Sequence, residues 1–241
     1  MVTPAAGPAG ACHPHFIRIW RLVMLNRPAA LPTRRVDKDV GATAVQQPLA
    51  LVTVLTLVDT VQLVQKILGE AFPSCAFAVS VHSTDAGTLL DVSWTDGPRV
   101  DQVGRFVNPL QARRLGAGGS TVAVEHFALT PVGCHVVRLA ADRVSLTRAF
   151  SDAAVERALN VVERRYRERL SPDSRAALSV ASYRAGVLCG VEVEGVHRVG
   201  AKRTGSCLQS DIDEILSAST DVAGFPRSPT AAGLFVRRDV H

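Results

Sequence analysis

The chain has 241 residues, of which 47% are hydrophobic and 20% are charged, and its formal net charge is +5. A chain of this length can bury the core of one large domain, or of one modest domain with tails. The most apolar stretch, residues 49–58, has about half of the ~20 residues that a membrane-spanning helix needs. We therefore expect no membrane span.

The positive charge is unevenly distributed along the chain. Residues 1–48 hold six Arg or Lys and two Asp, a net charge of +4, which leaves a net charge of +1 for the rest. The chain contains 24 Arg and only 3 Lys, which points to a coding bias more than to a phosphate-binding stripe. Composition is therefore a poor argument for nucleic-acid binding.

The five cysteines are odd in number, far apart and without a Cys-x-x-Cys pair. This pattern predicts reduced thiols. Since no signal peptide is recognised, the expected compartment is the cytoplasm.

The first 48 residues contain six prolines and no sustained hydrophobic period. This composition predicts a disordered tail or a start codon placed too far upstream. The apolar run at residues 16–25, which two arginines interrupt, is the one part that could form a transient amphipathic helix.

The first predicted elements are a helix and a hairpin. Apolar residues at helical spacing predict a helix over residues 60–71, capped by Asp59 or Thr60. Two-residue alternation predicts strands over residues 76–82 and 89–94, and the short Gly-containing connection between them predicts an antiparallel hairpin.

A sharp turn and a second helix follow this hairpin. Gly97 permits a positive φ, and Pro98 suits the first position of a helix over residues 98–107. Further extended segments are predicted at residues 121–127, 135–139 and 144–146.

The clearest helix is predicted over residues 152–170. Ser151 is a suitable N-cap, and the acidic first turn and basic last turn agree with the helix dipole. Beyond it the pattern weakens, with a possible strand at 187–193 and a short helix at 210–216.

The domain organisation follows from these segments. Residues 49–170 are predicted to form the core domain, residues 171–224 a weakly patterned C-terminal extension and residues 225–241 a tail. The predicted fold class is α+β: a small antiparallel sheet of three to five strands, with helices 60–71, 98–107 and 152–170 packed on one face.

Three sequence blocks resemble one known family. They are Gly69-Glu-Ala-Phe-Pro73, Phe77-Ala-Val-Ser-Val81 and Asp91-Val-Ser-Trp-Thr-Asp-Gly-Pro98. In this order they resemble the large polyvalent protein-associated domain family, twenty-ninth type, over residues 60–150. The loop at 113–120 departs from the family, in which we expect a more polar, aromatic-containing stretch.

The resemblance implies a context more than a mechanism. Domains of this family occur in proteins of phages, plasmids and other bacterial mobile elements, without an established catalytic activity. We therefore expect a non-catalytic accessory domain that needs no cofactor and binds a protein partner. The sequence defines neither that partner nor the oligomeric state.

Polar residues of the hairpin are the candidates for chemistry. Asp91 and Ser93 lie on the strand face opposite Trp94, and His82 is expected near them across the hairpin. A His, a Ser and an Asp suggest nucleophilic catalysis, but the Gly-x-Ser-x-Gly elbow is absent. A solvated strand face is favoured, with His82, Asp91 and Ser93 kept as candidate binding residues.

The turn after the hairpin has a structural interpretation. Trp94 is in phase with the apolar strand positions, which predicts a core anchor. Asp96 could act as a base or a ligand, but an Asp at this place also caps a helix, and the cap is favoured. Gly97 and Pro98 are structural. A hydrolase that uses His82, Asp91 and Asp96 is the least favoured hypothesis.

No metal site or phosphate loop is predicted. Cys12, His13 and His15 lie in the predicted tail, where nothing holds a tetrahedral geometry. The pairs Glu125-His126 and Cys134-His135 point to opposite strand faces. The Gly-rich loop at 116–119 lacks the Lys-Ser/Thr ending of a phosphate loop.

Nucleic-acid binding is the second hypothesis, through the sheet face or through the helix over 152–170. Arg164, Arg165, Arg167 and Arg169 are the candidate contacts. The glutamates interleaved with them are typical of a solvated helix face, which favours the protein partner. A binder of single strands would expose aromatic residues on its sheet.

Overall fold

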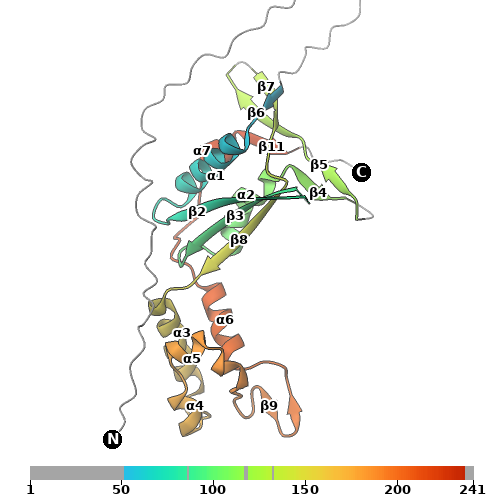
Figure 1. Ribbon diagram of the computed structural model, residues 1–241. Helices are drawn as coiled ribbons and strands as arrows, with labels where there is room; N and C mark the ends of the chain where they lie inside the picture. The colour runs from blue at the N-terminus through green and yellow to red at the C-terminus, as the bar shows by residue number, and fades with distance from the viewer. Residues whose placement is uncertain (1–51, 86, 117–118, 132, 237–241) are drawn as a thin grey trace, which may run out of the picture. The chain divides into compact units, whose positions relative to one another are not determined.

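The computed structural model describes residues 52–85, 87–116, 119–131 and 133–236, so the predicted N-terminal tail lies outside the described residues. Helices and strands are both present, which confirms the α+β fold class (Figure 1). The described helices are α1 (Leu57–Ala71), α2 (Val100–Val107), α3 (Asp152–Tyr166), α4 (Pro172–Ala176), α5 (Val180–Arg184), α6 (Leu208–Ala218) and α7 (Pro229–Ala232), with 3-10 turns η1 (Asn108–Leu110) and η2 (Val187–Gly190). The described strands are β1 (Val52–Val54), β2 (Phe77–Thr84), β3 (Gly87–Thr95), β4 (Arg113–Leu115), β5 (Thr121–Ala123), β6 (His126–Thr130), β7 (Gly133–Arg138), β8 (Arg143–Ala149), β9 (Arg198–Val199), β10 (Lys202–Arg203) and β11 (Leu234–Val236).

Helix α1 begins three residues before the predicted start. Thr56 is its N-cap: the Asp59 backbone N–H donates to Thr56 Oγ1 at 3.2 Å, and the Thr56 N–H donates to Asp59 Oδ2 at 3.0 Å. Asp59 is therefore not the cap but the third residue of a capping box.

A three-stranded sheet, in the order β2-β3-β8, corrects the prediction of a purely antiparallel sheet. Strands β2 and β3 form the predicted antiparallel hairpin. Strand β8 pairs with β3 in parallel, because α2 and several strands intervene and return the chain in the same direction.

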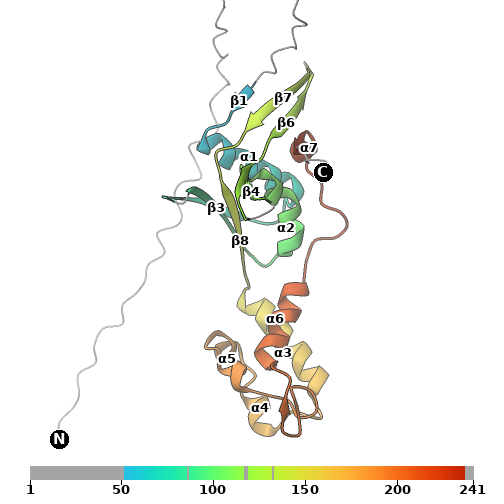
Figure 2. The same ribbon diagram turned by 90° about the vertical axis from the view of Figure 1, so that its right-hand side faces the viewer.

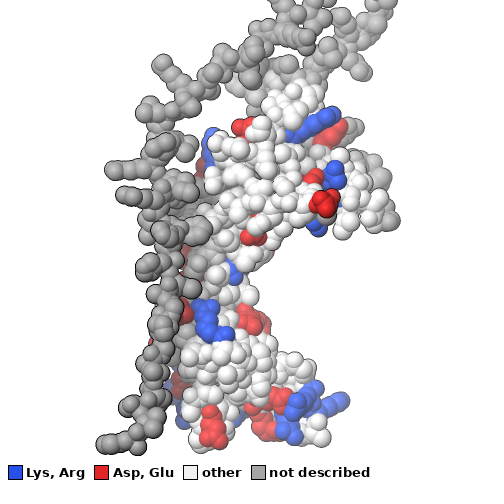
Figure 3. All heavy atoms as spheres, in the orientation of Figure 1, with Lys and Arg blue, Asp and Glu red and all other residues white. Residues whose placement is uncertain are grey.

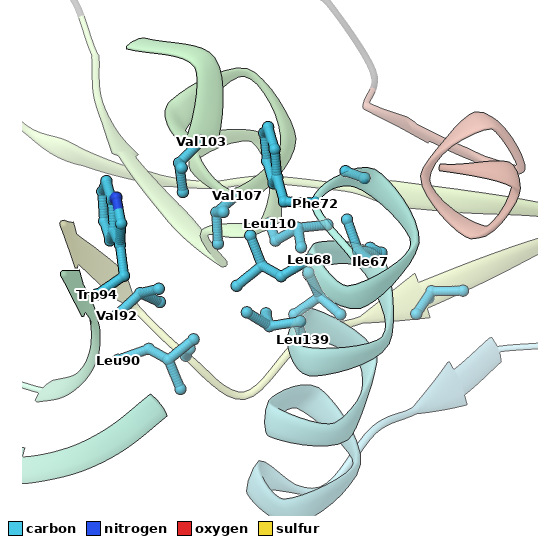
Figure 4. Packing of buried hydrophobic residues seen from close by; sticks show 14 residues of the cluster. Ile67, Leu68, Phe72, Leu90, Val92, Trp94, Val103, Val107, Leu110 and Leu139 are labelled. Atoms are coloured by element: carbon cyan, nitrogen blue, oxygen red, sulfur yellow. The ribbon is translucent and has the colours of Figure 1, made fainter. Parts of the chain in front are cut away.

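One face of this sheet carries the first core. Helices α1 and α2 both lie on that side of the sheet (Figure 2). In Figure 4, Trp94 and Leu90 of β3 point toward Leu68 of α1 and Val103 of α2. The opposite face is turned toward the viewer in Figure 3 and is largely uncharged.

A four-stranded sheet has the order β1-β7-β6-β11. Strand β1 is parallel to β7, and β11 is antiparallel to β6. Residues 225–241 were predicted to be a tail, but α7 and β11 lie within them. Three residues are too few for β11 to show an alternating pattern.

Helix α3 corrects the prediction that three helices share one sheet face. Its buried side packs in a second core with α6, and the predicted helix at 210–216 corresponds to α6. The predicted strand at 187–193 is instead the turn η2, where Gly186 has a φ of 70° and Leu188 is fully buried. None of the helices in the described ranges is both long and apolar enough to cross a membrane.

Candidate functional site

Trp94 anchors the end of β3 in the first core. Its side chain is 4% exposed, and its ring lies 5.6 Å from that of Phe77. The indole N–H donates to the Pro98 carbonyl at 2.9 Å and so closes the turn that follows the strand. The tryptophan is therefore not available as a stacking surface.

Asp96 holds two segments of backbone together. Its φ is 58° and that of Gly97 is 65°, so the turn has two consecutive left-handed residues. Asp96 Oδ1 accepts a hydrogen bond at 2.9 Å from the N–H of Ser151, the N-cap of α3. The prediction that Asp96 caps the helix after Pro98 is therefore wrong.

Arg148 of β8 is the hub of this turn, and the sequence analysis missed it. Its guanidinium donates to the carbonyls of Asp96 and Gly97, both at 3.0 Å. It also donates to the carbonyls of Leu216 and Ser219 at the end of α6, at 3.3 and 3.0 Å. One side chain thus links the turn after β3 to α6.

His82, Asp91 and Ser93 share the sheet face opposite the first core. Ser80 Oγ lies 3.3 Å from His82 Nε2, and Asp91 is paired with Ser80 in the β2–β3 register. In the described part of the chain His82 and Asp91 form no hydrogen bond or ion pair with each other. Asp96 is held apart by Ser151, so the residues of the hydrolase hypothesis do not form a relay.

Glu70, in the first block of the resemblance, clasps the C-terminal segment. Its carboxylate accepts hydrogen bonds from Ser228 Oγ at 2.6 Å, from the Thr230 N–H at 3.0 Å and from Thr230 Oγ1 at 2.7 Å. The bonds from Ser228 and Thr230 lower the pKa of Glu70 to about 2. The clasp therefore holds α7 against α1.

Acid should open this clasp. Because the pKa is lowered in the folded chain, the stability that Glu70 contributes is complete above about pH 4.5 and is lost as the pH falls toward about 2. Glu70→Gln should have a lower thermal midpoint than the wild type at pH 6, and the two midpoints should converge near pH 2. Melting curves at several pH values, with Glu156→Gln as a control on the exposed side of α3, test this. A difference that is constant over the pH range would contradict it.

A buried polar network lies in the second core. The Val193 N–H donates to His197 Nδ1 at 3.0 Å, which leaves His197 Nε2 to donate to Asp211 Oδ2 at 3.1 Å. The Tyr166 hydroxyl donates to the same carboxylate oxygen at 2.7 Å. Burial, and then this bond, raise the pKa of Tyr166. Because each of these polar groups has a partner inside the network, the network has a structural role.

His126 in β6 also has a structural role. His126 is fully buried, and its Nε2 lies 2.7 Å from the Pro109 carbonyl, to which it donates. Among the described residues, no group of three or more His, Cys, Asp or Glu is arranged to hold a metal ion.

The candidate arginines lie at the end of α3. Arg164 and Arg165 are in the helix, whereas Arg167 and Arg169 follow it, because α3 ends at Tyr166 and not at residue 170. All four are exposed. Surface hollows of about 590 and 680 Å³ lie beside them.

The outward face of the four-stranded sheet is largely apolar. Directly paired residues share a face, and the register aligns Val52, Val136, Phe127 and Phe235 in one row across all four strands. In the adjacent row, His126 and Val137 of the two central strands are buried. We call the apolar members of the outward set the apolar sheet face: Val52, Val54, Phe127, Leu129, Cys134, Val136 and Phe235. The exposed Arg138, which pairs with Val54, shares this side of the sheet.

Several side chains of the apolar sheet face are well exposed to solvent. Val52 is 52% exposed, Leu129 60% and Phe235 46%. This face was not predicted from the sequence, because β1 and β11 are too short to show a period and because apolar residues in strands were expected in the core. Exposed apolar surface of this kind makes the face a candidate interaction site.

Comparison with known proteins places the family domain within the described residues. Residues 55–166 match the family model described as large polyvalent protein associated domain 29. The match runs from the capping box of α1 to the end of α3, includes all three resemblance blocks and confirms the resemblance. No curated protein and no solved structure matches the chain.

Proposed function

We infer, from the premise that residues 55–166 belong to the large polyvalent protein associated domain 29 family, that this chain is a non-catalytic protein-interaction module. It acts in the bacterial cytoplasm as an accessory of a phage or plasmid. Its partner is a protein that presents an apolar surface.

The apolar sheet face carries this proposal. Its central row crosses four strands without a charged residue, and Leu129 extends it along β6. A sheet normally turns such a row toward a core, where each fully buried large side chain contributes about 1.5–3 kcal/mol. A protein partner would bury these side chains and supply that stabilisation on binding.

The polar candidates support a non-catalytic role. Asp96 is bound to Ser151, and His82 has Ser80 as its partner instead of Asp91. The buried His197 accepts a backbone N–H at one ring nitrogen and faces Asp211 with the other. These contacts join parts of the fold.

A double substitution tests the proposal. Leu129→Ser with Phe235→Ser removes two exposed side chains of the apolar sheet face. The matched control, Val199→Ser with Phe225→Ser, removes side chains that are 63% and 89% exposed elsewhere. Proteins captured from the bacterial host by the tagged wild-type chain are identified, and the affinity of each is measured with all three purified chains.

The expected result is a partner whose affinity falls at least about tenfold with the first pair, or about 1.4 kcal/mol, and stays unchanged with the control. Equal losses with both pairs, or no loss with the first, would overturn the proposal.

A further inference from the structure

A row of arginines follows the exposed side of α3. Val155, Leu159 and Val162 of this helix are buried, and Arg157, Asn160, Arg164 and Arg167 recur at helical spacing on another side. The ten steps from Arg157 to Arg167 rise by about 15 Å at helical geometry. With Arg165 and Arg169, these arginines form what we call the arginine ridge: Arg157, Arg164, Arg165, Arg167 and Arg169.

In the described part of the chain, the arginines of the ridge are not paired with neighbouring carboxylates, although the glutamates between them in the sequence suggested such pairing. Within the described ranges, no arginine of the ridge forms an ion pair with a carboxylate. The one hydrogen bond from Arg164 Nε goes to the Asn160 carbonyl of its own helix, at 3.2 Å. The remaining guanidinium donors of Arg164 are available to an external acceptor.

The surface beside the ridge is hollowed, and charged residues contribute to the lining of both hollows. A hollow of about 590 Å³ is lined by Arg157, Asn160, Val161, Glu163, Arg164 and Arg167. A second hollow, of about 680 Å³, is lined by residues 164–169. Arginine is the commonest residue in both linings, each of which also contains one glutamate. Guanidinium groups bind phosphate oxygens in a bidentate way.

More cations lie on the nearby β9–β10 hairpin. Arg169 lies against Gly195, since a Cβ on that glycine would be 3.8 Å from Arg169 Nη1. The hairpin itself carries Arg198, Lys202 and Arg203, of which Arg203 is paired with Glu192 at 3.4 Å. Figure 3 shows a group of Lys and Arg side chains there, with acidic side chains beside them.

These observations favour, as the ligand, a linear polyanion whose bases do not need to stack on aromatic side chains of the protein. Tyr166, the aromatic residue at the end of α3, is buried and its hydroxyl is bonded to Asp211. Stacking platforms are what binders of single strands use. We propose that the arginine ridge binds the phosphate backbone of a nucleic-acid duplex, independently of its sequence.

The test measures binding of the full chain to labelled 20-base-pair DNA and RNA duplexes by fluorescence anisotropy, at about 50 and 200 mM salt. The ridge variant is Arg157→Gln, Arg164→Gln and Arg167→Gln. The control variant, Lys66→Gln, Arg143→Gln and Arg227→Gln, removes the same charge from exposed positions elsewhere. Any contribution of the basic residues at 1–48 is common to all the chains. A further variant with lysine at the three ridge positions keeps the charge.

At least one duplex should bind the wild type with an affinity that falls steeply with salt. The ridge variant should bind at least about tenfold more weakly, with a salt slope lower by about 3, whereas the control should lose less than about threefold and the lysine variant should retain most of the binding. Binding of only one duplex type would identify it as DNA or RNA.

Three results would overturn the proposal. One is an equal loss in the ridge and control variants, and another is no measurable duplex binding by the wild type. The third is tighter binding of a single strand, or of a polyglutamate peptide, than of either duplex, because that would indicate a different partner. Circular dichroism melts of each variant show whether a loss reflects unfolding. The Leu129→Ser, Phe235→Ser chain should bind the duplex like the wild type, so this test is separate from that of the apolar sheet face.

Discussion

Replacing Trp94 by alanine should lower the free energy of unfolding by roughly 3–5 kcal/mol. The side chain is 4% exposed and packs on Phe77, so its removal leaves a cavity between β3 and the helices. The Pro98 carbonyl also loses the indole N–H that satisfies it. Urea unfolding of the two chains measures the difference.

Trp94→Phe separates these two contributions. It keeps an aromatic ring against Phe77 but removes the N–H donor, so its loss should be smaller than that of the alanine variant, at about 1–2 kcal/mol. An alanine variant that unfolds within about 0.5 kcal/mol of the wild type would show that the tryptophan is not a core anchor.

Arg148→Met should lower the free energy of unfolding by about 2–4 kcal/mol. Four backbone carbonyls, at Asp96, Gly97, Leu216 and Ser219, lose a charged donor, and a hydrogen bond to a charged group contributes about 1.5–3 kcal/mol before solvent replaces part of it. Methionine keeps the packing of the aliphatic stem but loses the contact of the guanidinium with the Phe150 ring, 4.8 Å from its centroid.

Urea unfolding of Arg148→Met and of Arg143→Met separates this effect from the general effect of removing a charge from β8. Arg143 is exposed, and its replacement should change the stability by less than about 0.5 kcal/mol. Equal losses for the two variants would mean that the bonds to the four carbonyls contribute no net stability.

The hydrophobic period of the sequence predicted those helices and strands that are long and have one buried face. Trp94 in β3 and Leu159 in α3 show this best, because each belongs to a long run with a clear period. The capping box at Thr56 was a readable signal that was missed, since a Thr followed three residues later by Asp stands just before the apolar run.

Long-range pairing was not readable from one chain. The parallel partner of β3 lies beyond α2, and no local period states that Arg148 will stand opposite Trp94. Glu70 was recognised only as part of a sequence block, since its partners Ser228 and Thr230 lie far along the chain. The apolar sheet face was missed for the same reason, since pairing between distant strands forms it.

The apolar sheet face shows where the assumption of buried apolar residues fails. Phe235 lies in a segment interpreted as a tail. It comes to lie beside Phe127 only through the pairing of β11 with β6. Whether an apolar row faces a core or the solvent depends on which elements cover it, and the sequence does not state that.

Hydroxyl-radical footprinting of the chain, free and in complex with the partner captured from the host, tests the interaction face most directly. If the apolar sheet face binds the partner, oxidation of Leu129, Phe127 and Phe235 falls severalfold in the complex. Oxidation of Phe225, which is 89% exposed and lies outside that face, stays unchanged. Unchanged oxidation of Leu129 and Phe235 in the complex, with protection elsewhere on the chain, would contradict the account.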